Sequence, residues 1–119
     1  MQFQKVLIAM VKRVLFVCSQ NRLRSPTAER VFFDRPGFEV ASAGLNTDAE
    51  VPVSSELLKW ADVIFVMEKV HRNKLSKKFR PYLKDKRVIC LDILDEYDYM
   101  DPALVRLLEA KAGHFFRVT

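Results

Sequence analysis

Residues 14–26 read Val-Leu-Phe-Val-Cys-Ser-Gln-Asn-Arg-Leu-Arg-Ser-Pro. The apolar residues at the start of this stretch predict a short buried strand, and the proline at its end is typical of the first turn of a helix. Between them, Cys18 is followed after five residues by Arg24 and Ser25, in the pattern Cys-x5-Arg-Ser. A strand, a tight loop and a helix therefore set a thiol and a guanidinium at the two ends of one loop.

A loop of this kind can bind a tetrahedral oxyanion. Its backbone N–H groups can point inward, and the N-terminus of the following helix adds the positive end of its dipole. Arg24 contributes a forked, permanently charged pair of donors. The same positive field favours the nucleophilic thiolate form of Cys18. An inert buried cysteine and a surface arginine are the alternatives, but a cation is unfavourable in the first turn of a helix unless an anion binds there.

The stretch resembles the phosphate-binding loop of the low-molecular-weight protein tyrosine phosphatases. That family has an apolar strand, a cysteine, five residues that include an asparagine, then Arg-Ser-Pro and an Ala-Glu pair. The matching residues here are Cys18, Asn21, Arg24, Ser25, Pro26, Ala28 and Glu29. Three further segments resemble the turn after the family's second strand, its third strand and the site of its catalytic acid; they are Ser42–Gly44, Ala61–Met67 and Asp101-Pro102.

The resemblance implies a cysteine-dependent phosphatase that hydrolyses a phosphate monoester, with protein phosphotyrosine as the expected substrate. Cys18 would attack phosphorus to form a phosphocysteine, Arg24 would clamp the phosphoryl oxygens, and Asp101 would act as general acid. Ser25 would hydrogen-bond the thiolate, and Asn21 would organise the loop by bonding neighbouring backbone groups. The expected substrate-binding residues are Ser19, Gln20, Asn21, Arg22, Leu23 and Ser25. No metal and no organic cofactor is implied.

The assignment of the acid is open at this point. Asp101 precedes a proline, and an aspartate in that position is also a standard N-cap of a helix. Asp98 is a rival acid in the same acidic stretch, residues 92–101, which lacks the ligand spacing of a calcium loop. Neither His71 nor His114 has a partner at a spacing typical of a triad or a metal site, so we expect each to be exposed or half-buried. Cys90 lies in an apolar run and is expected to be a core thiol.

Several positions depart from the family's pattern. Gln20 replaces a common glycine of the loop, which puts a side chain at its rim. Ala103 and Leu104 stand where aromatic residues usually follow Asp-Pro, and Tyr97 or Tyr99 would have to form the wall instead. These altered walls keep a second function open, a non-catalytic module that binds phosphate or a phosphoprotein. A thiol arsenate reductase on the same fold is a further alternative, but its chemistry needs additional cysteines for a disulfide relay and only Cys90 remains.

Strand-like and helix-like segments alternate along the chain. This alternation predicts an α/β fold in three layers, a parallel sheet of four or possibly five strands with helices on both faces. The resemblance implies a flavodoxin-like strand order, with the phosphate loop after the first strand, at the carboxyl edge of the sheet. The expected strands are 14–17, 38–43, 63–67 and 88–91, and the expected helices are 26–34, a short one capped by Ser54 or Ser55, 68–79 and one that starts at Asp101.

Length and composition fit one globular domain. The chain has 119 residues, half of them hydrophobic, and a formal charge of +5. Residues 1–11 precede the family's usual start, so we expect an N-terminal extension there, with Met10 a second candidate for the natural start. Two cysteines and no apolar run long enough to span a bilayer favour a cytoplasmic protein.

The basic stretch within residues 72–87 is expected to be a solvated surface, because no aromatic residues interleave it in the manner of a nucleic-acid site. We therefore expect a phosphorylated protein or a small phosphate ester as the partner, with no nucleic acid and no membrane. The oligomeric state is left open.

Overall fold

The computed structural model describes residues 11–117. The question of the N-terminal extension and of the Met1 or Met10 start therefore lies outside the described residues. The strands are β1 (Lys12–Cys18), β2 (Phe38–Gly44), β3 (Val63–Val66) and β4 (Arg87–Cys90). The helices are α2 (Arg24–Phe32), α3 (Ser55–Trp60), α4 (Lys69–Phe79) and α5 (Pro102–Ala112), with single 3-10 turns at η1 (Arg80–Tyr82) and η2 (Gly113–Phe116).

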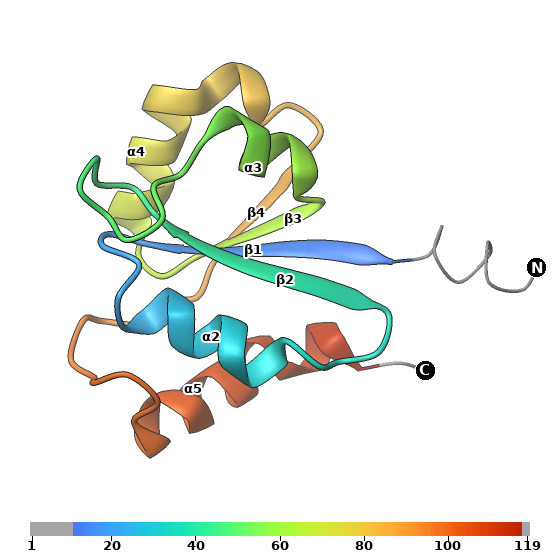
Figure 1. The fold of residues 1–119 in the computed structure, drawn as a ribbon, viewed down its shortest axis with the longest axis vertical. Coiled ribbons are helices and arrows are strands. Elements are labelled where there is room, and N and C mark those ends of the chain that lie inside the picture. The colour runs from blue at the N-terminus through green and yellow to red at the C-terminus, as the bar shows by residue number, and fades with distance from the viewer. Residues whose placement is uncertain (1–10, 118–119) are drawn as a thin grey trace, which may run out of the picture.

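The four strands form one parallel sheet in the order β2-β1-β3-β4. Helices α2 and α5 lie on one face of this sheet, and α3 and α4 lie on the other (Figure 1). The three-layer α/β fold and its strand order are therefore confirmed, with four strands in the part of the chain that the structure describes. None of the helices between residues 11 and 117 is long and apolar enough to cross a lipid bilayer.

The central strand β1 is buried on both faces because its side chains alternate between two cores. Val14, Phe16 and Cys18 belong to the core under α2 and α5, whereas Leu15 and Val17 belong to the core under α3 and α4. A strand with helices on both sides explains why this run is apolar throughout. It also directs the side chain of Cys18 toward the side of the sheet that α2 covers.

The ends of three helices refine the sequence prediction. Helix α2 begins at Arg24, two residues before the predicted start, and its N-cap is Leu23. Ser25 therefore lies inside the first turn and is not the cap. Ser54 caps α3 through its hydroxyl, and Asp101 caps α5 by accepting a hydrogen bond from the Ala103 N–H.

Strand β4 lies at the edge of the sheet, which corrects the prediction for Cys90. Its thiol is only partly buried, against the core under α3 and α4, and it donates to the carboxylate of Asp92 at 3.4 Å. An apolar run predicts a strand but does not distinguish an edge strand from a central one.

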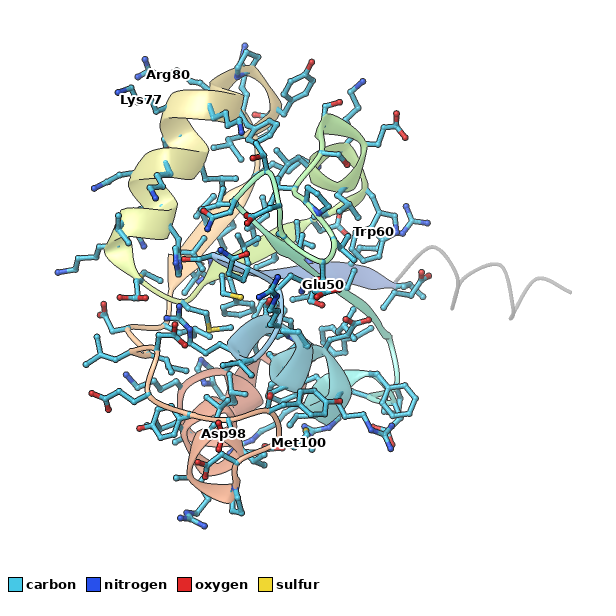
Figure 2. The ribbon with its side chains drawn as sticks, turned by 60° about the vertical axis from the view of Figure 1, so that its left-hand side comes forward. Glu50, Trp60, Lys77, Arg80, Asp98 and Met100 are labelled. Carbon is cyan, nitrogen blue, oxygen red and sulfur yellow. The ribbon has the colours of Figure 1, made fainter. Side chains whose placement is uncertain are left out.

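The basic stretch is solvated, as expected. Lys77 and Arg80 project from the outer end of α4 (Figure 2). The exposed basic residues of this stretch are Arg72, Lys74, Lys77, Lys78, Arg80, Lys84 and Arg87.

Candidate active site

The loop between β1 and α2 is held from its outer side by the segment that follows β2. The backbone carbonyls of the loop's first residues point outward and accept hydrogen bonds from that segment. These bonds run from Leu45 N to Cys18 O, from Asn46 N to Ser19 O and from Glu50 N to Gln20 O, at 2.9, 3.0 and 3.0 Å. Since the carbonyls are used outside, the loop's amide groups are free to face inward.

Gly44, at the end of β2, permits this close approach. A Cβ atom at this position would lie 2.6 Å from the carbonyl oxygen of Ser19 and 2.9 Å from the backbone nitrogen of Asn21. Both neighbours are backbone atoms, which cannot move aside without reshaping the loop. The end of β2 therefore fixes the shape of the loop, and Ser42–Gly44, which the resemblance assigned to the turn after the second strand, lie within the strand itself.

The loop offers a set of unsatisfied N–H donors. Asn21 N donates to the Cys18 sulfur at 3.3 Å. Among residues 11–117, no acceptor receives a hydrogen bond from the backbone N–H of Ser19, Gln20, Arg22 or Leu23. These donors lie just before the N-terminus of α2, where the helix dipole is positive. The arrangement is suited to an anion.

The Cys18 thiol lies against the hydroxyl of Ser25, with sulfur and oxygen 2.9 Å apart. Ser25 Oγ also accepts from the amide nitrogen of Asn21 at 3.0 Å, and its single hydrogen has two acceptors within reach, the Cys18 sulfur and the Ala43 carbonyl at 3.3 Å. Asn21 adopts a left-handed conformation (φ 56°), and its amide also donates to the hydroxyl of Ser42 at 2.9 Å. Asn21 thus organises the loop through two hydroxyls, not through the backbone groups that were expected.

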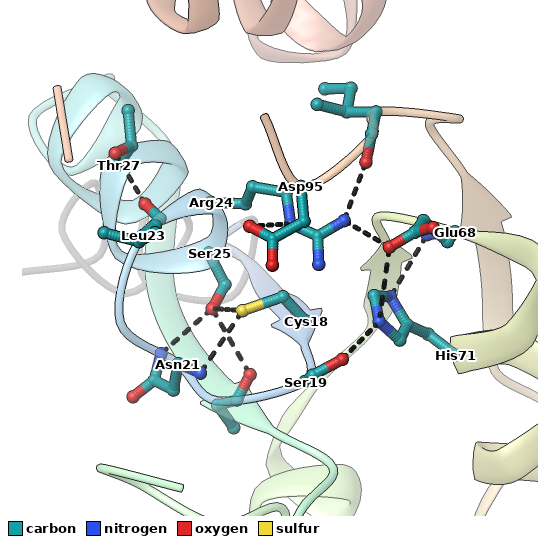
Figure 3. A network of polar contacts seen from close by, with 12 residues as sticks. Cys18, Ser19, Asn21, Leu23, Arg24, Ser25, Thr27, Glu68, His71 and Asp95 are labelled. Atoms are coloured by element: carbon teal, nitrogen blue, oxygen red, sulfur yellow. Dashed lines mark hydrogen bonds and ion pairs between the residues drawn. The ribbon is translucent and has the colours of Figure 1, made fainter. Parts of the chain in front are cut away.

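Arg24 is buried, and one edge of its guanidinium is fixed by the protein. Nη1 donates to the Glu68 carboxylate at 2.5 Å and to the Ile93 carbonyl at 2.8 Å (Figure 3). Nε lies 3.7 Å from the carboxylate of Asp95, and Nη2 has no hydrogen-bond partner in the described part of the chain. The edge formed by Nε and Nη2 therefore remains available for an anion.

His71 is fully buried, contrary to the prediction of an exposed or half-buried ring. Its Nδ1 accepts a hydrogen bond from Glu68 N at 3.1 Å, and its Nε2 lies 2.9 Å from the hydroxyl of Ser19. Burial and the neighbouring Arg24 lower the pKa of His71 from 6.5 to about 4. The ring is therefore neutral at pH 7, and because Nδ1 accepts, the proton lies on Nε2 and is donated to Ser19.

Most of the predicted site residues line one pocket. Its lining residues are Cys18, Ser19, Gln20, Arg22, Leu23, Arg24 and Asp95. Asn21 and Ser25 lie behind it, buried under the loop. Sequence reasoning did not single out Asp95 beyond its place in the acidic stretch, and it did not assign Glu68 or His71 to the site.

Four other predicted residues do not line this pocket. Asp101 caps α5, and Asp98 is exposed beside Met100 over that helix (Figure 2). Tyr97 packs against the core under α2 and α5, and Tyr99 lies over the outer side of α2. Thus none of the residues lining the pocket in the described structure is aromatic.

Comparisons by sequence and by structure give different results. No family model matches the sequence, and no curated protein matches it significantly. The tyrosine phosphatase Wzb from Escherichia coli K30, solved with phosphate, is similar in structure at 20% identity and a TM-score of 0.74, over 89% of this chain and 96% of that one. Wzb from Vibrio vulnificus, solved with benzylphosphonate, matches at 25% identity and a TM-score of 0.72, over 87% and 96% of the two chains.

A low-molecular-weight protein tyrosine phosphatase from T. tengcongensis matches at 23% identity and a TM-score of 0.68, over 86% of this chain and 93% of that one. Structures of the arginine phosphatase YwlE are similar as well. These matches span nearly the whole of each known structure. The chain therefore has the fold of the low-molecular-weight protein tyrosine phosphatases.

Proposed function

We propose that this chain is a cysteine-dependent phosphatase that hydrolyses phosphate monoesters through a phosphocysteine at Cys18. The observation that carries the proposal is the content of one pocket: a thiol, unsatisfied backbone N–H donors and the unused edge of the Arg24 guanidinium all face it. Inorganic phosphate and benzylphosphonate occupy similar structures, which supports a phosphate ester as the ligand.

The proposed reaction has two steps. The loop amides and Arg24 bind the phosphoryl oxygens, and the Cys18 thiolate attacks phosphorus. The P–S bond forms, the P–O bond to the leaving group breaks, and an acid donates a proton to the leaving oxygen. Water then attacks phosphorus and gives a proton to the same group, the P–S bond breaks, and inorganic phosphate leaves. The Ser25 hydroxyl, 2.9 Å from the sulfur, stabilises the thiolate at both ends of the cycle.

We propose protein phosphotyrosine as the first substrate to test, because tyrosine phosphatases are among the similar structures. The absence of aromatic side chains from the described pocket lining gives no specific wall for a phenol ring. A phosphorylated protein or a small phosphate ester is therefore the proposed partner. The attack needs Cys18 as a free thiol, which fits the reducing cytoplasm expected from the sequence.

A thiol arsenate reductase is not supported, because the second cysteine lies too far away. Strand β3 separates β1, which carries Cys18, from β4, which carries Cys90. Neighbouring strands lie about 4.8 Å apart, so the two Cα atoms are separated by roughly 10 Å, whereas a disulfide needs less than about 7 Å. The remaining alternative is a module that binds phosphate without turnover.

An assay of the wild type with p-nitrophenyl phosphate and with phosphotyrosine, phosphoserine and phosphoarginine peptides tests the proposal. We expect turnover of the aryl phosphate, none by Cys18→Ser, and wild-type rates for Cys90→Ser, the matched cysteine control. Acid quenching of the wild type should trap phosphate on Cys18, detectable by mass spectrometry. Phosphate binding without turnover of any substrate would indicate the binding module, and turnover by Cys18→Ser would exclude the proposed nucleophile.

A further inference from the structure

We propose that three lysines of α4 form a second subsite, which binds an acidic segment of the phosphorylated protein whose phosphate enters the Cys18 pocket. This inference rests on the proposed phosphatase function and narrows its substrate to phosphoproteins with carboxylates near the phosphorylated residue. The subsite is an open cleft of about 490 Å³ between α4 and the segment that follows β2. Its described lining residues are Leu45, Asn46, Thr47, Lys74, Lys77 and Lys78.

The cleft has an unbalanced positive charge. Three lysines line it, and none of its described lining residues is a carboxylate. All three lysines are exposed, and none of them forms an ion pair with any of residues 11–117. Lys74 stands three and four residues before Lys77 and Lys78, so the three share one face of α4, where like charges repel. A bound acidic segment would relieve this repulsion.

The helix dipole accounts for only part of this cluster. It favours cations in the last turn of a helix, which is where Lys77 and Lys78 lie. Lys74 lies one turn earlier, where the dipole gives no such advantage. A ligand that carries several carboxylates is therefore the better explanation of all three lysines together.

The wall opposite the lysines offers neutral hydrogen-bonding groups. Asn46 is partly exposed and Thr47 is exposed, and both line the cleft. The side-chain amide of Asn46 and the hydroxyl of Thr47 can donate to the carboxylate or the backbone carbonyls of a peptide. An acidic segment could thus be held from both sides.

The cleft lies beside the phosphate pocket, since α4 and the segment after β2 are neighbours in the fold (Figure 1). On one wall, Asn46 donates its backbone N–H to the carbonyl of Ser19 at 3.0 Å, and Ser19 lines the phosphate pocket. On the other wall, His71 lies one turn before Lys74, and its Nε2 is 2.9 Å from the Ser19 hydroxyl. A peptide whose phosphate is bound in the pocket can therefore continue past Ser19 into the cleft.

An acidic peptide segment fits the cleft better than a single small anion or a nucleic acid. With about 490 Å³ against 220 Å³ for the phosphate pocket, the cleft has room for more than one side chain. Lysine is a flexible point charge, which suits carboxylates that differ in position from one substrate to the next. None of the described lining residues is aromatic, so a nucleic-acid base would have no ring to stack on.

The test compares two phosphotyrosine peptides, one with aspartate and glutamate around the phosphotyrosine and one with asparagine and glutamine in their places. Because each exposed ion pair contributes only a few-fold, we expect wild-type kcat/KM to be about tenfold higher for the acidic peptide. The preference should nearly disappear at about 1 M salt, where the Debye length is about 3 Å.

The variant that combines Lys74→Gln, Lys77→Gln and Lys78→Gln should hydrolyse the two peptides at similar rates. Each ratio of rates is measured on one preparation, so incomplete folding of a variant does not change it. The matched control combines Arg72→Gln, Lys84→Gln and Arg87→Gln, which removes the same charge from exposed positions outside the cleft. This control should keep the preference for the acidic peptide.

A preference that survives in the cleft variant, or that the control loses to the same extent, would overturn the inference. Equal wild-type rates with the two peptides would do the same, as would turnover of p-nitrophenyl phosphate but of neither peptide. A single-stranded oligonucleotide that binds the wild type more tightly than the acidic peptide, and binds the cleft variant weakly, would assign the cleft to nucleic acid instead.

The proposed function fails by a different result. p-Nitrophenyl phosphate has no flanking residues to reach the cleft, so it reports the phosphate pocket alone. A wild type that does not turn over this ester and traps no phosphocysteine would overturn the phosphatase proposal itself.

Discussion

Arg24 uses the two edges of one guanidinium for two purposes. Nη1 is bound to Glu68 and the Ile93 carbonyl, while the edge formed by Nε and Nη2 faces the pocket. Only a planar fork can serve both sides, because an ammonium group is a compact donor at the end of a single chain. The side chain is therefore oriented before any ligand arrives, and little reorganisation is needed on binding.

Substitution of Arg24 tests this arrangement. Arg24→Lys keeps the positive charge but loses the fork, so kcat/KM for p-nitrophenyl phosphate should fall at least tenfold, or roughly 1.4 kcal/mol of transition-state stabilisation. Arg30→Lys, at an exposed position of the same helix, is the matched control and should be unaffected. Wild-type rates for Arg24→Lys would show that this side chain does not contact the phosphoryl group.

At the scale of residues, the sequence predicted the local part of the site and missed the distant part. Cys18 ends β1, and Arg24 and Ser25 begin α2 at the other end of one short loop, so their spacing alone indicates how they meet. His71 reaches Ser19 across 52 residues of sequence, and Glu68 reaches Arg24 across 44. No spacing rule connects such pairs, because the third strand has to pair with the first before they come together.

The element that shapes the phosphate loop is the end of β2, and Gly44 tests its role. In Gly44→Ala the new methyl group would meet the backbone of Ser19 and Asn21, so the loop would have to move. We expect a loss of stability of about 1–3 kcal/mol, typical of overpacking, together with weaker phosphate binding. Chemical denaturation and isothermal titration with inorganic phosphate measure the two effects.

Gly113→Ala provides the control for this substitution. There the new methyl group would meet the carboxylate end of the exposed Glu109 side chain, whose surface ion pair with Arg35 can shift more cheaply than a backbone segment. The stability of Gly113→Ala and its affinity for inorganic phosphate should both stay near those of the wild type. If Gly44→Ala were also neutral, the loop would not depend on close contact with β2.

The helices and strands themselves were largely predictable from the periodicity of apolar residues and from the capping and turn residues that separate them. The centre of β1 and the whole of β3 are apolar runs, and α3 begins after its predicted serine cap. The exposure of β4 was not predictable, since edge and central strands share the same apolar pattern. The segment between β4 and α5 has no regular secondary structure to give it a periodic pattern, so the place of Asp95 at the pocket required the fold.

For the whole molecule, the buried His71 ring links stability to pH. Its pKa is lowered from 6.5 to about 4 in the folded protein, mainly by burial. Below pH 6.5 the imidazole of His71 is protonated in the unfolded chain but stays neutral in the folded protein. The free energy of unfolding therefore falls as the pH falls from 6.5 to 4. The full loss from this one group is on the order of 3 kcal/mol, and above pH 6.5 the group contributes no further change.

Urea denaturation at a series of pH values, compared between wild type and His71→Asn, measures this effect. The variant should be less stable at pH 7, where Ser19 and Glu68 N lose their partner, but it should lose less stability on acidification. Parallel curves for the two proteins between pH 6.5 and 4 would contradict a buried, neutral imidazole.

The parallel topology also sets the order in which the molecule can fold. Arg24 meets its partners 44 and 69 residues later in the chain, and β1 pairs with strands that follow it through long crossovers. Closing such large loops costs conformational entropy before the stabilising contacts have formed, so these contacts form slowly. The residues of the phosphate loop thus leave the ribosome early but take up their final geometry late, once the segment after β4 has docked. Until that moment Cys18 lacks the neighbours that surround it in the folded loop, and the time at which the refolding chain first binds inorganic phosphate would mark the docking of that segment.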